Sequence, residues 1–176
     1  MKNKYVVFDR DGTLIEYKPY LNNSNEVKLN PGAKTLIKNL IKNSNKLFLH
    51  TNQSGVSRGF FLLEQVYKCN DAMIKLLDIN EKIFERICIA LELDSSKTSY
   101  RKPSPLFGNE IINEYKISKT DLVYIGDNIS DLETAHNIGC KGFGIINDNL
   151  NPDVSNNLYG FKTFKDLNTL NNYLYG

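Results

Sequence analysis

Two kinds of hydrophobic pattern alternate along the chain. Short apolar runs predict buried strands, and these runs lie at about 5–8, 46–50, 86–91, 121–125 and 142–146. Between them, apolar residues recur every three or four positions, which is the spacing of one face of a helix. The segments with this spacing lie at about 31–43, 60–77, 105–115 and 130–137.

This alternation predicts an α/β fold in three layers, in which helices cover both faces of a doubly wound parallel sheet. The predicted strands are almost entirely apolar, as is typical of strands that are buried on both faces. The 176 residues fit one domain, with neither an internal repeat nor a long linker. Because ligands of open parallel sheets bind beyond the carboxyl ends of the strands, the polar residues that follow each strand are the candidates for function.

Two carboxylates follow the first strand. Asp9 and Asp11 come directly after the apolar run 5–8, and Gly12 and Thr13 allow a sharp turn after them. Two carboxylates at the end of a buried strand repel each other and lose water, which is costly unless a cation or a phosphate-transfer task holds them there. By itself, this fragment is more typical of an ordinary acidic turn.

Three more polar fragments follow later strands, at residues 51–55 (TNQSG), 101–103 (RKP) and 126–131 (GDNISD). Taken alone, each has a structural interpretation: a helix cap or turn, a solvated pair of charges, and a strand-to-helix turn. Their occurrence at successive strand ends favours one shared site. Together with Asp9 they would supply a nucleophile, hydroxyl and amide donors, a fixed cation and carboxylates for a metal.

Composition argues against several other classes of protein. The chain is 41% hydrophobic and 24% charged, which is ordinary for a globular protein, and 22 basic against 20 acidic residues leave a net charge of +2. This balance favours neither a nucleic-acid partner nor a membrane surface. The chain shows no signal peptide and no apolar run long enough to span a membrane. We therefore expect a cytoplasmic protein, and we expect a monomer.

The cysteines and histidines give no metal or catalytic pattern. Cys69, Cys88 and Cys140 are far apart, and no histidine lies near enough in the sequence to complete a zinc site. We expect these three thiols to be reduced and buried. His50 and His136 are expected to be packing or surface residues rather than catalytic ones.

The four polar fragments, in this order, resemble the motifs of the haloacid dehalogenase superfamily of aspartate-dependent phosphohydrolases, and the resemblance spans residues 5–146. Residues 9–13, 51–59 and 101–103 are similar in particular to the branch that contains heptose bisphosphate phosphatases and histidinol-phosphate phosphatases. The resemblance implies the superfamily's Rossmann-like core. We expect it to lack a cap domain, because the segment 12–30 is short and a single helix follows the second strand.

The resemblance also implies a mechanism. Asp9 would attack phosphorus to give an aspartyl-phosphate, and Asp11 would protonate the leaving group and later activate water. Mg2+ would be held by the Asp9 carboxylate, the Asp11 backbone carbonyl and Asp127, since this cation prefers oxygen ligands. Thr51 and Lys102 would stabilise charge on the transferred phosphoryl group.

Further residues would complete the site. Asp131 would orient Lys102 or lie in the outer shell of the metal rather than ligate it. The residues expected to contact the substrate are Tyr20, Asn52, Gln53, Ser54, Arg58, Arg101 and Asn128. Among them, Asn52 would also donate to the phosphoryl oxygens, and the two arginines would bind a second anionic group.

The chain departs from the resembled branch in one place. Members of that branch usually carry a zinc-binding loop of three cysteines and one histidine before the RKP fragment, whereas residues 91–100 contain neither residue type. We therefore expect Mg2+ and no zinc. The resemblance implies hydrolysis of a small phosphorylated metabolite, with D-glycero-D-manno-heptose 1,7-bisphosphate as the leading substrate. Histidinol-phosphate phosphatase, polynucleotide 3'-phosphatase and a non-catalytic phosphate-binding module stay as alternatives.

Overall fold

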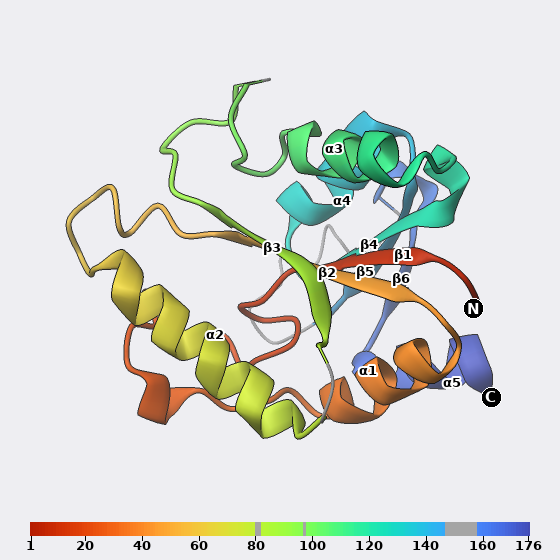
Figure 1. Ribbon diagram of the computed structural model, residues 1–176, viewed down its shortest axis with the longest axis horizontal. Helices are drawn as coiled ribbons and strands as arrows, with labels where there is room; N and C mark the ends of the chain where they lie inside the picture. Colours follow the sequence, from red (N-terminus) through yellow and green to blue (C-terminus); the bar gives the residue numbers. More distant parts are fainter. Residues whose placement is uncertain (80–81, 97, 147–157) are drawn as a thin grey trace.

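The computed structural model describes residues 1–79, 82–96, 98–146 and 158–176. Within these ranges, six parallel strands form one sheet in the order β3-β2-β1-β4-β5-β6 (Figure 1). The strands are β1 (Tyr5–Phe8), β2 (Lys46–Asn52), β3 (Phe84–Ala90), β4 (Leu122–Gly126), β5 (Lys141–Ile145) and β6 (Lys162–Phe164). The α-helices are α1 (Ala33–Lys42), α2 (Leu63–Leu77), α3 (Leu106–Tyr115), α4 (Ile129–Ile138) and α5 (Leu167–Tyr175). None of these helices is long and apolar enough to cross a membrane.

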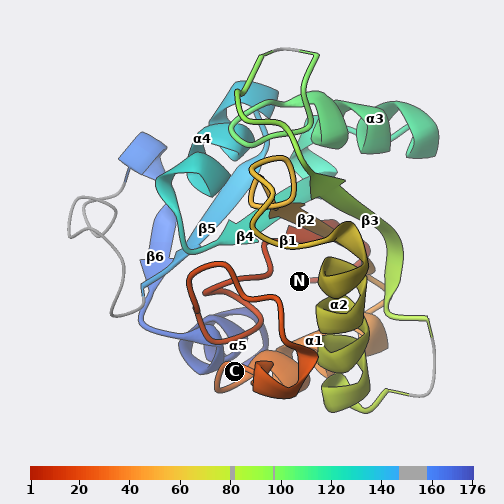
Figure 2. The ribbon, with the colours of Figure 1, turned by 90° about the vertical axis from the view of Figure 1, so that its left-hand side faces the viewer.

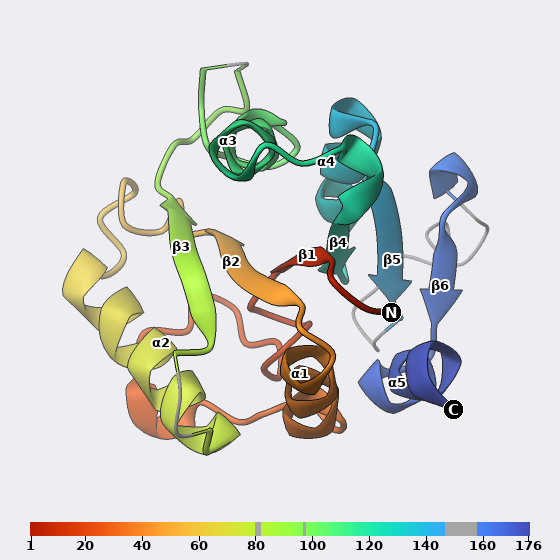
Figure 3. The ribbon, with the colours of Figure 1, turned by 45° about the vertical axis from the view of Figure 1, so that its right-hand side comes forward.

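The helices form two layers around the sheet. Helices α1, α2 and α5 lie on one face, and α3 and α4 lie on the other (Figure 1, Figure 3). Successive side chains of a strand point to opposite faces, so β1 contributes to two apolar cores. Val6 and Phe8 belong to the core that contains Met73 of α2, whereas Val7 belongs to the core that contains Phe107 of α3. The predicted three-layer α/β fold is confirmed.

The strand order reverses at the centre of the sheet. Strands β1 and β4 are neighbours, and β1 leads through α1 to β2 on one side while β4 leads through α4 to β5 on the other. Such a reversal leaves a crevice beyond the carboxyl ends of the two central strands. These ends face the viewer in Figure 2, together with the loops that follow β1 and β2. Asp9 and Asp127, which follow β1 and β4, therefore come together at this crevice.

In the part of the chain that is described, the segments that connect β1 to α1 and β2 to α2 contain no additional domain. Residues 9–32 contain the short 3-10 helix η1 (Ser24–Glu26), and residues 53–62 form a loop that leads into α2. Both arrangements agree with the expected core without an inserted cap at these positions. The helix predicted over 60–77 begins only at Leu63.

Strand β2 is longer than the sequence pattern predicted. It continues through Thr51 and Asn52, because these residues pair with Ile89 and Ala90 of β3. The polar residues expected to follow the strand are therefore its last two members. Sheet pairing fixes their backbone, which makes them better anchors for a site than residues in a loop.

The prediction missed the last two elements, β6 and α5. Strand β6 has three residues and no apolar run, and it exists because it pairs with β5. Helix α5 packs on α1, where Asn39 Nδ2 donates to Asn171 Oδ1 at 2.9 Å and Leu167 and Leu170 are buried. Tertiary contacts rather than local pattern define both elements. The polar stretch 147–153, predicted to be a loop, lies outside the described residues.

The three cysteines are free and buried, as predicted. Burial raises the pKa of Cys88 to about 12 and that of Cys140 to about 12. A buried thiol of this kind stays protonated near neutral pH and is a poor nucleophile. The cysteines therefore act as packing residues.

Candidate active site

The loop after β1 is held by a side chain from further along the chain. Gly12 has a φ of +87°, a conformation that glycine adopts at little cost, and the chain turns there. Asn30 Nδ2 donates to the carbonyl oxygens of Gly12, Thr13 and Ile15 at 2.9, 2.9 and 3.0 Å. These bonds fix the backbone directly after the two predicted catalytic carboxylates.

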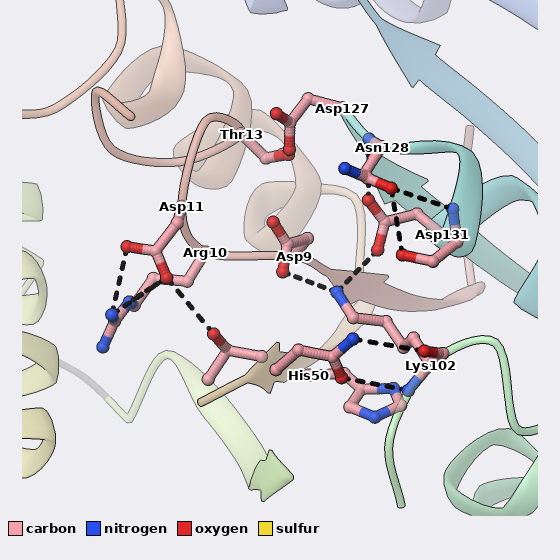
Figure 4. Close-up of polar contacts among 12 residues, drawn as sticks. Asp9, Arg10, Asp11, Thr13, His50, Lys102, Asp127, Asn128 and Asp131 are labelled. Carbon is pink, nitrogen blue, oxygen red and sulfur yellow. Dashed lines mark hydrogen bonds and ion pairs between the residues drawn. The ribbon is translucent and has the colours of Figure 1, made fainter. Parts of the chain in front are cut away.

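Lys102 joins two buried carboxylates at the centre of the site (Figure 4). Its Nζ lies 2.5 Å from Asp9 Oδ1 and 2.5 Å from Asp131 Oδ1. The side chains of Lys102, Asp9 and Asp131 are 3%, 10% and 2% exposed, so water screens their charges only weakly. Asp131, predicted to orient Lys102 or to lie in the outer shell of the metal, contacts Lys102 directly.

The start of α4 aims the Asp131 side chain. The Asn128 backbone N–H donates to Asp131 Oδ2 at 3.0 Å, and Asn128 Oδ1 accepts from the Ser130 backbone N–H at 3.1 Å. This reciprocal pair is a capping box, which stabilises a helix start by satisfying its free N–H groups. Asn128, predicted to bind substrate, thus also caps α4 with its side-chain oxygen.

Three carboxylates gather in the crevice. One carboxylate oxygen from each of Asp9, Asp127 and Asp131 lies within 4.8 Å of the other two. Thr13 Oγ1 donates to Asp127 Oδ1 at 2.9 Å and fixes its orientation. Lys102 compensates only one of the three negative charges. A small divalent cation with oxygen ligands, such as Mg2+, fits both the remaining charge and the donor set.

The charges of this cluster shift one another's pKa values. Burial raises the pKa of Asp9, and this effect outweighs the opposing attraction of Lys102. Burial alone would lower the pKa of Lys102, but the nearby carboxylates of Asp131 and Asp9 raise it above its ordinary value. Lys102 is therefore a permanent cation in the site.

Asp11 points away from this cluster and toward Arg10 (Figure 4). Arg10 Nε donates to Asp11 Oδ2 and Arg10 Nη2 donates to Asp11 Oδ1, both at 3.0 Å. Gln53 Nε2 donates to Asp11 Oδ2 at 2.8 Å, and Thr51 Oγ1 lies 3.4 Å from the same oxygen. Thr51 and Gln53, both predicted to contact the substrate, thus contact Asp11 here.

The Asn52 side chain also has a protein partner. Its Oδ1 accepts from the Lys102 backbone N–H at 2.9 Å, and its Nδ2 donates to the Lys102 carbonyl oxygen at 3.2 Å. This two-point contact positions the backbone of Lys102 relative to β2. In this structure, the Asn52 amide group that was predicted to bind phosphate therefore holds the Lys102 backbone.

Two adjoining cavities open over these residues. We call the one of about 410 Å³ the main cavity; it is lined by Asp9, Asp11, Tyr17, Thr51, Asn52, Arg101, Lys102, Asp127, Asn128, Ser130 and Asp131. The other, of about 160 Å³, is the side cavity, and its lining includes Tyr20, Gln53 and Ser54. Both linings share Asp11 and Asn52. The cavities thus bring together all predicted site residues except one.

That exception is Arg58, whose contact with substrate stays a prediction. Arg58 is exposed and lines neither the main nor the side cavity. Its backbone N–H donates to the Ser54 carbonyl oxygen at 3.1 Å, in the turn between β2 and α2. Arg101, by contrast, lines the main cavity as predicted.

The comparison with known families agrees with this geometry. The family model described as haloacid dehalogenase-like hydrolase matches residues 13–145. The chain belongs to this family. The match confirms the resemblance that the four polar fragments indicated.

Curated relatives of this hydrolase are phosphatases. It is 32% identical over 146 residues to the D-glycero-beta-D-manno-heptose-1,7-bisphosphate 7-phosphatase of Haemophilus influenzae, covering 79% of this chain and 78% of the relative. It is 25% identical over 173 residues to the corresponding alpha-heptose enzyme of Campylobacter jejuni, covering 98% of this chain and 96% of the relative. The hydrolase is therefore a phosphatase.

A solved structure shares the fold of the hydrolase. The D,D-heptose 1,7-bisphosphate phosphatase of B. bronchiseptica, complexed with magnesium and phosphate, matches with a TM-score of 0.85 and 24% identity. The match covers 97% of each chain. The likeness in fold thus extends over nearly the whole length of both chains.

The two histidines of the hydrolase behave as predicted. His50 is fully buried, and burial together with the charge of Lys102 lowers its pKa to about 3. Its Nε2 donates to the Tyr100 carbonyl oxygen at 2.7 Å. His136 is exposed and stacks on the Tyr159 ring, with 4.3 Å between ring centroids.

Sequence reasoning missed two residues of the hydrolase that contact the site from behind. Arg10 is fully buried and bonds Asp11, and Asn70 of α2 accepts a hydrogen bond from Arg10 Nη1 at 2.8 Å. The sequence did contain a signal for the buried role of Asn70, because this residue lies between Val66 and Met73 on the apolar face of α2. A polar residue in such a stripe needs a buried partner.

Proposed function

We propose that this phosphatase is a Mg2+-dependent phosphomonoester hydrolase that works through an aspartyl-phosphate on Asp9. Its proposed substrate is D-glycero-D-manno-heptose 1,7-bisphosphate, cleaved at the 7-phosphate. The observation that carries the proposal is the position of Asp9, which lines the main cavity at the end of β1 with its carboxylate 2.5 Å from Lys102 Nζ. A buried carboxylate beside a fixed cation and two further carboxylates is suited to phosphoryl transfer.

The proposed reaction has two displacements. In the first, an Asp9 carboxylate oxygen attacks phosphorus, the bond from phosphorus to the sugar oxygen breaks, and Asp11 gives its proton to that oxygen. In the second, Asp11 takes a proton from water as the water oxygen attacks phosphorus. The bond to Asp9 then breaks and inorganic phosphate leaves. Asp11 is suited to both steps because it lines both cavities.

The proposed charge stabilisation comes from Lys102 and Thr51. Lys102 is held between Asp9 and Asp131, so its ammonium group needs little reorganisation when charge develops on the phosphoryl oxygens. Thr51 is 1% exposed at the end of β2 and lines the main cavity. Its hydroxyl can turn from Asp11 toward a phosphoryl oxygen without movement of the backbone.

The residues proposed to hold Mg2+ are Asp9 and Asp127 through their carboxylates and Asp11 through its backbone carbonyl. One oxygen of Asp9 and one of Asp127 lie within 4.8 Å of each other, which supports these two carboxylates as ligands. When bound, the cation reduces the repulsion between carboxylate and phosphate and polarises a phosphoryl oxygen. Asp131 already bonds Lys102 and the Asn128 backbone, so we assign it to positioning.

The proposed substrate rests on the relatives and on the cavity linings. The two curated relatives described above are named as heptose 1,7-bisphosphate 7-phosphatases. Arg101 lines the main cavity and Lys18 lines the side cavity, so both are placed to meet a second phosphate. Residues 91–100 contain no cysteine or histidine, and we propose that this phosphatase binds no zinc there.

Phosphate release tests the proposal. The substrates are heptose and hexose bisphosphates, histidinol phosphate and a 3'-phosphorylated oligonucleotide, each with Mg2+ and with EDTA. We expect metal-dependent turnover that is greatest for the heptose bisphosphate. Preference for histidinol phosphate or for the oligonucleotide would overturn the proposed substrate.

The nucleophile is tested by Asp9→Asn, with Asp78→Asn as the control. Asp78 lies on the surface at the end of α2 with a φ of +51°, which asparagine tolerates well. Asp9→Asn should remove turnover and should also remove the phosphorylated Asp9 peptide detected by mass spectrometry after acid quenching. The control should keep both. Turnover by a folded Asp9→Asn protein would overturn the mechanism.

A further inference from the structure

Asn70 is a buried polar residue on the apolar face of α2. It is 3% exposed, and Val66, Cys69 and Met73 are buried beside it on the same helix. A buried amide costs free energy unless it has a hydrogen-bond partner. Its hydrogen-bond partner is Arg10, whose Nη1 donates to Asn70 Oδ1 at 2.8 Å. Helix α2 is therefore tied to the loop after β1.

Arg10, which bonds Asn70, also bonds the Asp11 carboxylate. The arginine is fully buried, and its Nε and Nη2 make a two-point contact with the Asp11 carboxylate at 3.0 Å each. A guanidinium fork fixes both the direction and the plane of a carboxylate, which a single bond does not. Gln53 supports the same carboxylate at 2.8 Å from the side of β2.

We infer that Arg10 and Asn70 are positioning residues for Asp11, so that α2 sets the place of the proton donor at the junction of the two cavities. This inference rests on the proposed function, in which Asp11 protonates the leaving group. It goes further by assigning a role in the reaction to a helix residue that lines neither the main nor the side cavity.

A positioning role for Arg10 and Asn70 has a kinetic consequence that a purely structural role lacks. The alkoxide of a sugar alcohol is a poor leaving group and needs a proton as the phosphorus–oxygen bond breaks. The 4-nitrophenolate ion is stable without that proton. A misplaced Asp11 should therefore slow the first displacement on alkyl phosphates and spare the first displacement on 4-nitrophenyl phosphate, whereas hydrolysis of the aspartyl-phosphate is common to both substrates. General loss of structure would slow both.

The experiment compares KM and the rate of the first displacement, measured as release of the alcohol or of 4-nitrophenol in a single turnover, for heptose 1,7-bisphosphate and 4-nitrophenyl phosphate in four proteins. These are the wild type, Asn70→Ala, Asn70→Asp and Asn45→Ala. Asn70→Asp keeps an oxygen acceptor for Arg10. Asn45 is the matched control, because it is also a buried asparagine but bonds Leu40 at 2.8 Å and Lys4 at 2.9 Å, away from the site.

We expect Asn70→Ala to lower the rate of the first displacement with the heptose bisphosphate roughly 10-fold or more, with little change in KM and little change in the first displacement with 4-nitrophenyl phosphate. Asn70→Asp should recover much of the loss, and Asn45→Ala should show no difference between the two substrates. An equal loss on both substrates, or no loss, would overturn the inference. Asp9→Asn in the same assay tests the proposed function separately, because retained turnover there would overturn it whatever Asn70→Ala does.

Discussion

Gly126 leaves the space that the Asp131 carboxylate occupies. A Cβ atom at residue 126 would lie 2.2 Å from Asp131 Cγ and 2.2 Å from Asp131 Oδ2. These distances are far below van der Waals contact, so any larger residue at the end of β4 would push the Asp131 carboxylate away from Lys102. The glycine of the GDNISD fragment is thus needed for close approach rather than for an unusual backbone angle.

Gly126→Ala should therefore damage the site. We expect the displaced Asp131 to release Lys102, lowering kcat by at least about 10-fold, and we expect a loss of about 1–3 kcal/mol in the free energy of unfolding. Gly142→Ala in β5 is the control, because its Cβ would lie 2.7 Å from a Phe161 ring atom, outside the site. The control should lose stability and keep kcat. Enzyme assays and urea unfolding of both variants measure this, and normal kcat in Gly126→Ala would contradict it.

Lys102→Met should strongly destabilise the protein in the absence of metal. The change leaves Asp9 and Asp131 buried without their cation, and removing one partner of a buried ion pair typically costs roughly 3–5 kcal/mol. Lys4→Met is the control, since the Lys4–Asp121 pair is about one-third exposed and its loss should cost less than about 1 kcal/mol. Urea unfolding in EDTA provides both values. Similar losses in the two variants would show that the buried pair is not stabilising.

His50 should make stability fall as the solution becomes acidic. Its pKa is about 3 in the folded protein and 6.5 in the unfolded chain, so between these values only the unfolded chain gains the proton. The free energy of unfolding should therefore fall by up to about 1.4 kcal/mol per pH unit from this residue as pH drops below 6.5. His50→Gln lacks this proton uptake. Urea unfolding from pH 7 to pH 4.5 should give a steeper decline for the wild type, and parallel declines would contradict the prediction.

Mg2+ should stabilise the folded protein even without substrate. The cation would bind Asp9, Asp127 and the Asp11 backbone carbonyl only in the folded state, and a ligand at 100 times its dissociation constant adds about 2.7 kcal/mol. Thermal unfolding with Mg2+ and with EDTA measures the shift. Asp127→Asn should remove it, whereas the surface variant Asp78→Asn should keep it. A Tm that does not respond to Mg2+ in the wild type would contradict the proposed metal site.

Most of the fold could be predicted because its elements carry their own patterns. The apolar run at 5–8 is β1 as predicted, and the apolar spacing over 31–43 gave α1 to within two residues at each end. The failures lie where pattern is weak. Strand β6 is only three residues long and depends on its pairing with β5, so a local pattern had too few positions to show it.

The site was predicted unevenly for a similar reason. Asp9, Lys102 and Asp131 follow their strands at positions where a parallel sheet brings the residues together, and the structure joins them at 2.5 Å. Arg58 is exposed in the turn between β2 and α2 and lines neither cavity, so its contact with substrate stays a prediction. Side-chain direction in a turn depends on local backbone angles, which a polar pattern does not specify.

The sequence by itself determined the α/β class, the placing of the site at the carboxyl ends of the strands, and the carboxylates and cation that meet there. The hydrophobic periods imply that strands and helices alternate, and in the resulting parallel sheet the polar residues that follow the strands gather at one edge. Only the tertiary structure decided which partner each polar side chain takes. Asp11 bonds Arg10, and Arg10 bonds Asn70, which is 60 residues away along the chain. Such contacts depend on how α2 packs against the sheet, and a local sequence pattern does not predict contacts between residues that are far apart along the chain.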